Sequence, residues 1–470
     1  MNTRTEHDML GEMQIPSDRY FGAQTLRAVK NFYISGTPMS SQPKLIQALA
    51  TVKQATAMAN LEMGLLESKN AEAIIQAAEE IIQGSLHEHF PVDMIQGGAG
   101  TSANMNINEV VCNRALEILG HQKGEYEYLH PLNHVNLSQS TNDVVPTAMK
   151  IAIIWLSEDL IAAMVALRDA LFAKAEEFKS VIKMGRTQLQ DAVPMTLGQE
   201  FRAFGVSINE DIQNLRETVK LCYLINIGAT AIGTAINTVP GYIESVCRHL
   251  SQVSGLKLSN AIDLVESTSD AGTFVSVSSA LKRMAIRLTK LCNDLRLLSS
   301  GPQAGLGDIQ LPPMQPGSSI MPGKVNPVIP EVVNQIGFQV MGNDLVITMA
   351  AAAGQLQLNA FLPIILYNIC DSIKLLQRGC LTLKEKCIDG ITANIEKCAQ
   401  DVHRSAGLLT ALTPVIGYEA AATIAKKVQH SNKTAYELLQ ESGLLTAQEI
   451  ETLLSPEHLI NPQAQEKTKK

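Results

Sequence analysis

The chain has 470 residues, which is too long for one ordinary hydrophobic core and indicates two or three domains. Charged residues make up 18% of the sequence, against roughly 25% in a typical soluble protein, so we expect much of each subunit to face other subunits. The formal net charge of -8 argues against a nucleic-acid or anionic-membrane partner, because either usually requires a basic patch.

The start of the chain and its cysteines favour a cytoplasmic protein. The first twelve residues are polar and lack the apolar segment of a secretory signal, and no apolar run is long enough to span a membrane. The eight cysteines are scattered, without a C-x-x-C motif or a histidine at ligand spacing. This pattern favours buried free thiols in a reducing compartment over disulfides or a metal site.

Long helices are predicted through the middle of the chain. In residues 153–170, apolar side chains recur every three or four positions and also occur on the opposite face, which is typical of a helix buried on more than one side. The clearest pattern covers residues 277–298, where the same alternation is unbroken and basic residues lie between, as in a bundle seam. Further helices are predicted over residues 197–224, 331–353 and 364–395.

Loops are predicted where Gly, Pro, Ser and Asn cluster, and after about residue 397 the helical periods shorten. The sequence thus predicts a mainly all-α protein in three parts. These are an N-terminal, mainly helical domain (residues 1–140), a central long-helix bundle (141–396) and a small C-terminal helical domain (397–470).

Four polar segments are predicted to run directly into helices, and Pro146, Pro194 and Pro327 suit first helical turns. A helix start presents free N–H groups and favours carboxylates or phosphates. At any single helix such residues are more simply N-caps, but four together favour an anion site. The segments are residues 97–102, 136–143, 185–190 and 317–327.

Residues 317–327, GSSIMPGKVNP, are the most specific signal in the chain. Two glycines and two prolines flank paired serines, a lysine and an asparagine, a composition that suits either a mobile lid or a surface linker. A serine is a weak base unless positive charge or aligned N–H groups lower its pKa, so an isolated Ser-Ser pair is more commonly a cap. Lys324 and the helix start near Pro327 could supply such a field.

This segment resembles the signature of the aspartase/fumarase superfamily. Further segments that resemble the superfamily are GGAGTS (97–102), HVNLSQSTND (134–143), KMGRTQLQDAVPMTLGQEF (183–201), GATAIGT (228–234) and SSGP (299–302). The chain is more similar to the aspartase branch than to the fumarate hydratase branch, which commonly has His where this chain has Gln188 and Ser where it has Thr141. The resemblance implies a three-domain fold whose central bundle assembles into a multi-subunit helical core.

The resemblance also implies a reaction, the reversible deamination of L-aspartate to fumarate and ammonia by serine-base anti elimination through an aci-carboxylate. It implies Ser318 as the base, with Lys324 also catalytic, and Glu331 as either an acid/base group or a helix-dipole partner. The implied substrate-binding residues are Thr101, Ser140, Thr141 and Ser319 at the β-carboxylate, Thr187, Lys324 and Asn326 at the α-carboxylate, Asn142 with Thr101 at the amino group, and Gln188.

In the family the site is shared by three subunits of a homotetramer, so the same assembly is expected here. No cofactor or metal cluster is expected, although some aspartases respond to divalent cations. Several positions depart from the aspartase pattern, namely Leu132, Asn133, Gln303, Ala352 and the Phe361-Leu362 pair, and the last pair bears on substrate preference or activation. Two alternatives stay open, namely fumarate hydratase, with water as the addend, and a catalytically silent, crystallin-like structural protein.

Overall fold

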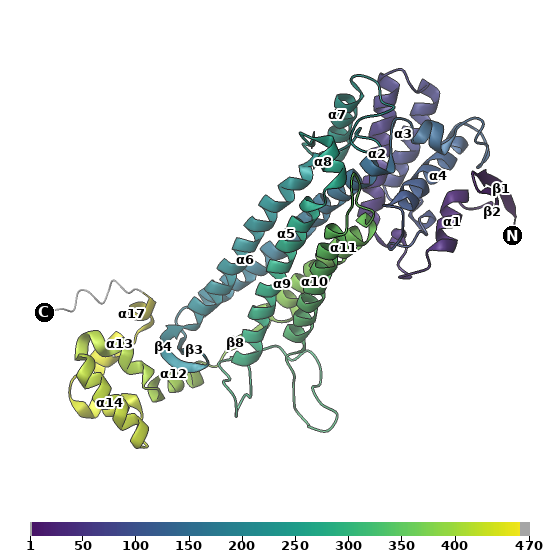
Figure 1. Ribbon diagram of the computed structural model, residues 1–470. Helices are drawn as coiled ribbons and strands as arrows, with labels where there is room; N and C mark the ends of the chain where they lie inside the picture. The colour runs from purple at the N-terminus through teal and green to yellow at the C-terminus, as the bar shows by residue number, and fades with distance from the viewer. Residues whose placement is uncertain (1, 461–470) are drawn as a thin grey trace. The chain divides into compact units, whose positions relative to one another are not determined.

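The computed structural model describes residues 2–460 and is mainly helical, as predicted (Figure 1). The chain forms two compact units. Unit 1 comprises Met1–Ile161, Gln213–Arg283 and Gln339–Leu376, and unit 2 comprises Ala162–Ile212, Met284–Phe338 and Gln377–Lys470. The predicted three-part division, with boundaries after residues 140 and 396, stays a prediction.

Five long helices supply one segment to each unit. They are α5 (Thr141–Glu177), α6 (Leu197–Val219), α9 (Gly272–Leu298), α10 (Val328–Ala352) and α11 (Leu362–Lys386). The predicted seam of residues 277–298 is confirmed, since every residue at its alternating four- and three-residue spacing is at most 5% exposed: Val277, Leu281, Met284, Leu288, Leu291, Leu295 and Leu298. In α5 the periodic positions of residues 153–170 are likewise buried. Burial of these stripes supplies most of the stability of such helices, because intrinsic helix propensity contributes little.

Unit 1 places three helices, α2, α3 and α4, side by side, with α7 against α2 (Figure 1). A short antiparallel hairpin, β1–β2, precedes them, and a two-residue parallel pair, β5–β6, lies later in the chain. The elements are β1 (Thr3–Asp8), β2 (Gly11–Pro16), α1 (Ala23–Asn31), α2 (Pro43–Glu62), α3 (Ser68–Ile82), α4 (Thr101–Ile118), β5 (Leu224–Ile225), α7 (Tyr242–Ser254), β6 (Ser259–Asn260) and α8 (Leu264–Ser269).

Unit 2 contains the antiparallel hairpin β3–β4, the short antiparallel pair β7–β8 and the C-terminal helices. The elements are β3 (Ile182–Thr187), β4 (Gln190–Thr196), β7 (Ile309–Gln310), β8 (Thr392–Ala393), α12 (Ile395–Arg404), α13 (Gly407–Ile416), α14 (Tyr418–His430), α15 (Ala435–Ser442), α16 (Ala447–Leu453) and α17 (Pro456–Ile460).

Two helices end earlier in the structure than the sequence pattern predicts. The helix predicted to residue 224 ends at Val219 in a 3₁₀ turn, and the one predicted to residue 395 ends at Lys386. After Lys386 the chain makes a 3₁₀ turn and then β8, yet Ile388 and Ile391 are fully buried there. The apolar spacing therefore continues past the end of the helix, so the sequence pattern does not reveal where the helix ends.

Two of the three prolines lie away from helix starts, whereas Pro327 immediately precedes α10. Pro194 lies in strand β4, so the prediction that residues 185–190 lead into a helix is wrong. Pro146 is inside α5, five residues after its start. Proline has no N–H, so the carbonyl of Asn142, four residues earlier, loses its helical donor. The Asn226 side chain donates to that carbonyl instead, at 3.1 Å, which explains why α5 tolerates the proline.

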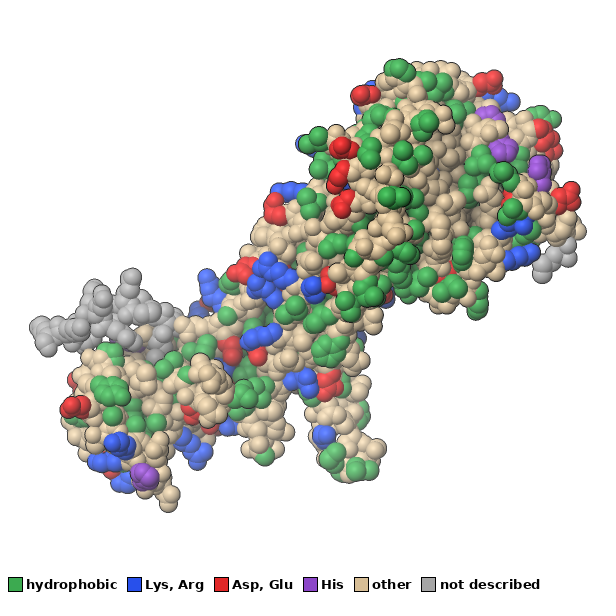
Figure 2. Space-filling view, viewed as in Figure 1, with side chains coloured by type: hydrophobic (Ala, Val, Ile, Leu, Met, Phe, Trp, Pro, Cys, Tyr) green, Lys and Arg blue, Asp and Glu red, His purple; other side chains and the backbone are tan. Residues whose placement is uncertain are grey.

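Helix α10 exposes large apolar side chains along one face. Phe338, Leu345 and Met349 are 60%, 60% and 64% exposed, and their spacings of seven and four residues place them on the same side of the helix. Hydrophobic side chains also appear among charged ones elsewhere on the visible surface (Figure 2). Within residues 2–460, no helix is long and apolar enough to cross a membrane.

Candidate functional site

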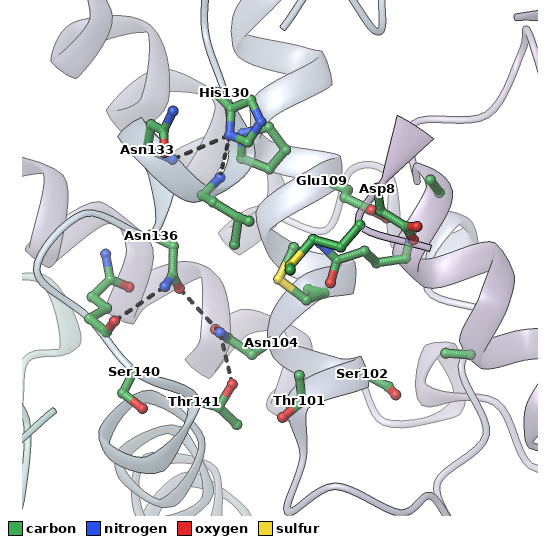
Figure 3. A pocket seen from close by; sticks show the side chains of 18 of the residues that line it. Asp8, Thr101, Ser102, Asn104, Glu109, His130, Asn133, Asn136, Ser140 and Thr141 are labelled. Atoms are coloured by element: carbon green, nitrogen blue, oxygen red, sulfur yellow. Dashed lines mark hydrogen bonds between the residues drawn. The ribbon is translucent and has the colours of Figure 1, made fainter. Parts of the chain in front are cut away.

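Unit 1 contains a cavity of about 1200 Å³ that is lined by three of the predicted substrate-binding residues, Thr101, Ser140 and Thr141 (Figure 3). The described residues that line it all belong to unit 1. Asn142 is not among them, but its side-chain amide donates to the Ala231 carbonyl at 2.7 Å, and Ala231 does line the cavity. Unit 1 therefore brings together the hydroxyl groups that were predicted from the GGAGTS and STND segments.

Thr101 is the first residue of α4, and the glycine-rich segment before it determines its position. Gly98, Ala99 and Gly100 all have left-handed φ values, of 88°, 56° and 95°. A Cβ atom on Gly100 would lie 2.8 Å from a methyl group of Val145 in α5, so only glycine lets the two helices approach this closely. The Thr101 hydroxyl donates to the Gly98 carbonyl at 2.8 Å. The predicted start of a helix in this segment is confirmed.

Ser140 and Asp143 together form the N-terminus of α5. The Ser140 hydroxyl accepts the N–H of Asn142 at 3.2 Å, and the Asp143 carboxylate accepts the N–H of Ser140 at 3.0 Å. The other oxygen of Asp143 accepts N–H groups from Gly228 (3.1 Å) and Thr230 (3.0 Å). Burial raises the pKa of Asp143 to about 6, although these hydrogen bonds oppose the rise. Asp143 thus ties the Ser140-Thr141 segment to the GATAIGT segment.

A fully buried lysine also supports the segment that contains Ser140 and Thr141. Lys53 of α2 donates to the side-chain oxygens of Asn104 (2.8 Å), Asn136 (3.1 Å) and Gln139 (2.7 Å). Asn104 in turn donates to the Thr141 hydroxyl at 3.2 Å (Figure 3). Burial lowers the pKa of Lys53 to about 7, with Asp143 opposing the fall. This network fixes the direction of the Thr141 hydroxyl.

Lys53→Met is expected to destabilise the protein, because the side-chain oxygens of Asn104 and Gln139 lose their Lys53 donor, at about 1–3 kcal/mol each, whereas that of Asn136 still accepts from two other amides. The pKa of Lys53 in the folded chain is about 7, below the value of 10.5 for a free lysine. Between pH 7 and pH 10.5 the lysine keeps its proton in the unfolded chain but loses it in the folded chain. The contribution of Lys53 to the free energy of unfolding therefore rises with pH. Denaturant unfolding at pH 7 and 9.5 should show a wild-type advantage over the variant that widens at the higher pH. Lys69→Met, an exposed lysine of α3, is the control, and an unchanged gap would contradict the prediction.

Two buried carboxylates beside the cavity have structural partners. Glu109 accepts backbone N–H groups from Gly22, Gln24 and Thr25 at 2.7–3.1 Å, and Glu6 accepts a further one from the same helix start. Burial raises the pKa of Glu109 to about 7. Both carboxylates cap the N-terminus of α1, where negative charge is favourable, so their contacts explain them without an acid–base role.

Unit 2 carries the segment of residues 317–327, hereafter the signature loop, which precedes α10. Its two ends are joined: the N–H of Gly317 donates to the Lys324 carbonyl at 2.8 Å, and the Asn326 side chain donates to the Gly317 carbonyl at 2.7 Å. A Cβ atom on Gly317 would lie 2.6 Å from that Lys324 oxygen, so glycine is required. Asn326 therefore closes the base of the loop.

Within the signature loop, Ser318 accepts two backbone N–H groups, from Ile320 at 3.2 Å and Met321 at 3.0 Å. Donors that point at a hydroxyl oxygen stabilise its deprotonated form, which is the condition for a serine to act as a base. Ser319 and Lys324 are exposed, and Glu331 lies in the first turn of α10, where a carboxylate complements the helix dipole.

Thr187 and Gln188 also belong to unit 2, at the tip of the β3–β4 hairpin. Gln188 and Leu189 form its two-residue turn, and both have left-handed φ values, of 53° and 62°. Such turns prefer Asn-Gly, and non-glycine residues in this conformation are strained. Thr187 and Gln188 are exposed, so their side chains are available to a ligand or a partner.

Lys53, Asn104, Asp143 and Asn226 were missed by sequence reasoning. One signal was available, because Lys53 is the only charged residue among residues 45–61, a stretch otherwise made of apolar and uncharged polar residues. Two partners of Asp143, Gly228 and Thr230, lie 85 and 87 residues later in the chain, and nothing local indicates them.

Comparisons with known proteins identify the class. The chain matches the family model described as Lyase over residues 11–342 and the one described as Fumarase C C-terminus over residues 408–461. It belongs to this lyase family, the aspartase/fumarase superfamily, and is an enzyme of the lyase class.

Individual relatives show how similar the chain is to particular members of this family. The aspartate ammonia-lyase of Pseudomonas aeruginosa is 55% identical over 462 residues, with 98% of each chain covered. Among solved structures, a fumarate lyase:delta crystallin from Brucella melitensis bound to cobalt is 52% identical, with a TM-score of 0.95 over 98% of this chain and 100% of that one. The class II fumarase of Schistosoma mansoni is 34% identical, with a TM-score of 0.91 over 98% of this chain and 100% of that one.

Proposed function

We propose that the chain catalyses the reversible deamination of L-aspartate to fumarate and ammonia. The observation that carries this proposal is the 55% identity, over nearly the whole chain, to an aspartate ammonia-lyase, compared with 34% to a class II fumarase. Thr141 and Gln188, where fumarate hydratases commonly have Ser and His, support the same choice.

The proposed chemistry begins with removal of a proton from C3 of aspartate by Ser318. The electron pair moves onto the β-carboxylate and gives an aci-carboxylate. It then returns to form the C2–C3 double bond as the C–N bond breaks and ammonia leaves. The barrier is chiefly that of stabilising the new negative charge, and each aligned donor contributes roughly 2.7–4 kcal/mol in comparable oxyanion sites. No step requires a cofactor.

In this proposal each hydroxyl and cation has a role. Thr101, Ser140 and Thr141 of the unit 1 cavity, with Ser319, hold the β-carboxylate, and Thr101 with Asn142 addresses the amino group. Thr187, Lys324 and Asn326 hold the α-carboxylate, and Gln188 contributes a hydrogen bond. The Ser318 contacts with two N–H groups support its role as the base.

The proposed assembly is a homotetramer in which three subunits supply each site. Its support is the exposed apolar face of α10 defined by Phe338, Leu345 and Met349, since a monomer would leave this face in water. A cytoplasmic location is proposed on the eight free cysteines, seven of them buried. Light scattering of the purified protein tests the assembly, and a monomeric mass at micromolar concentration would contradict it.

The test of function is ammonium dependence. Purified protein given fumarate and ammonium should consume fumarate and form L-aspartate, and should be inactive towards fumarate without ammonium. Equal consumption of fumarate without ammonium would instead indicate fumarate hydratase. Absence of both reactions from a correctly folded protein would favour a structural role.

A further inference from the structure

A buried cluster of charges lies beside the β3–β4 hairpin within unit 2. The Asp308 side chain is 1% exposed, and one of its oxygens lies 3.1 Å from Nζ of Lys183 and accepts from Nη1 of Arg186 at 2.8 Å. Lys183, itself 2% exposed, also donates to Glu200 at 2.6 Å. We call these four residues the Asp308 cluster. A carboxylate so buried is tolerated because two cations neutralise it.

Lys183 and Arg186 both reach the carboxylate of Asp308, although they lie three residues apart on strand β3. Side chains alternate between the two faces of a strand, so residues three apart should point in opposite directions. The pairing register shifts between Met184 and Arg186, where Gly185 of β3 stands opposite two β4 residues, Ala192 and Val193. The extra residue of this bulge is therefore on β4, and such a bulge increases the local twist of the strand pair. A Cβ atom on Gly185 would lie 2.8 Å from the Val193 carbonyl, so the bulge requires glycine.

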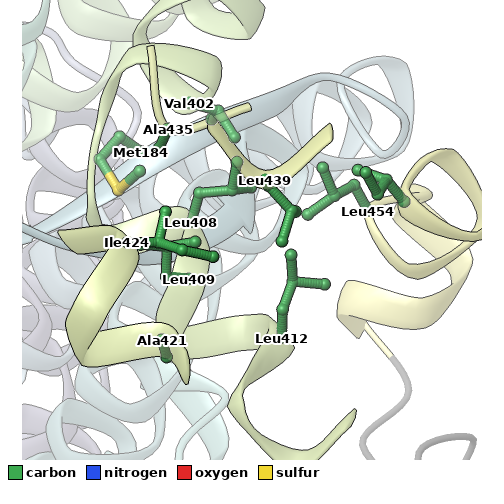
Figure 4. Close-up of a cluster of buried hydrophobic side chains, with 11 residues drawn as sticks. Met184, Val402, Leu408, Leu409, Leu412, Ala421, Ile424, Ala435, Leu439 and Leu454 are labelled. Carbon is green, nitrogen blue, oxygen red and sulfur yellow. The ribbon is translucent and has the colours of Figure 1, made fainter. Parts of the chain in front are cut away.

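The same strand is fixed on its other side by a hydrophobic cluster. Met184 is buried among residues of the C-terminal helices, including Val402, Leu408 and Leu409 (Figure 4). Asp308 is fixed as well, because its backbone carbonyl accepts the N–H of Asn394 at 3.0 Å. The hairpin is therefore held from both faces immediately before Thr187.

The tip of the hairpin needs this support. The Gln188-Leu189 turn places two non-glycine residues in left-handed conformations, which persist only where the surrounding structure imposes them. Thr187 is the last residue of β3, directly after Arg186, so any rotation of the strand at Arg186 moves the Thr187 hydroxyl.

We propose that Asp308 is a positioning residue for substrate binding: its ion pairs with Lys183 and Arg186, on either side of Gly185, set the direction of Thr187 towards the α-carboxylate. This inference rests on the proposed function, in which Thr187 binds that carboxylate. Asp308 itself contacts no substrate. Because misalignment of Thr187 weakens binding of a charged group and leaves the base in place, the effect falls on affinity more than on turnover.

The test compares Asp308→Asn with Asp191→Asn. Asp191 is the exposed carboxylate 4.0 Å from the same Arg186, and it serves as the matched control. Asp308→Asn should raise the KM for L-aspartate and the inhibition constant of succinate by about tenfold or more, the loss expected when a hydrogen bond to a charged group is weakened. Turnover at saturation should change less than about threefold. Asp191→Asn should leave all three constants near wild type.

A second variant tests the same inference in case Asp308→Asn does not fold. Arg186→Gln keeps the Lys183–Asp308 pair and should show the same rise in KM and in the inhibition constant if Asp308 acts through Arg186. The inference is overturned if either folded variant loses thermal stability but keeps wild-type constants for both ligands, or if turnover falls without a change in affinity. Wild-type protein without ammonium-dependent activity would overturn the proposed function, which is a different outcome from these.

Discussion

Ser318→Ala is expected to lower turnover of L-aspartate roughly 10²- to 10⁴-fold, the usual contribution of a positioned acid–base group. The hydroxyl that accepts two backbone N–H groups disappears, and no other group of the serine can accept a proton. The fold should persist, because the lost contacts are local to the signature loop. Steady-state kinetics and the thermal unfolding midpoint are the two measurements.

The control for this variant is Ser431→Ala. Ser431 is an exposed serine whose hydroxyl likewise accepts a backbone N–H two residues later, from Lys433. Ser431→Ala should leave turnover unchanged. This result would show that losing a serine hydroxyl that accepts a nearby backbone N–H does not by itself lower activity. Near-normal turnover in Ser318→Ala would remove Ser318 from the role of base.

Lys324→Met is expected to lower kcat/KM for L-aspartate by roughly 10- to 150-fold, which corresponds to the loss of a charge-assisted hydrogen bond of about 1.5–3 kcal/mol. The side chain is exposed on the signature loop, and methionine keeps its length while removing the ammonium group. The loop base should survive, since Lys324 contributes to it through its carbonyl. We expect the KM to rise, because the proposed partner is the substrate α-carboxylate.

Lys426→Met provides the matched control for this change, because Lys426 is an exposed lysine on α14. Lys324→Arg keeps the positive charge and should recover part of the lost affinity. If Lys324→Met bound and converted L-aspartate as the wild type does, the ammonium group would have no part in substrate recognition.

The long helices and three helix starts could be predicted from the sequence because their signals are local. The seam of α9 follows from apolar residues at three- and four-residue intervals, and α4, α5 and α10 begin at the polar segments that were identified. Of the predicted site residues, Thr101, Ser140 and Thr141 share one cavity, while the roles of Ser318, Lys324 and the others stay predictions.

What was missed depends on features that local patterns do not carry. The β3–β4 hairpin was taken for the approach to a helix because its turn is Gln188-Leu189 and lacks the Asn-Gly or Asp-Gly signal of a two-residue hairpin turn. Lys53 was missed because its acceptors, Asn104, Asn136 and Gln139, lie on other segments of unit 1. Such long-range pairs become visible only when the chain is folded.

The bonds of Asp143 bear on when the cavity can form as the chain is synthesised. A nascent chain that ends before residue 228 already contains Thr101, Ser140 and Thr141, but it lacks two N–H groups that donate hydrogen bonds to the buried Asp143. We therefore expect an N-terminal fragment ending near residue 220 to leave the start of α5 frayed. Hydrogen exchange at residues 140–144 would be fast in that fragment and slow in the intact protein.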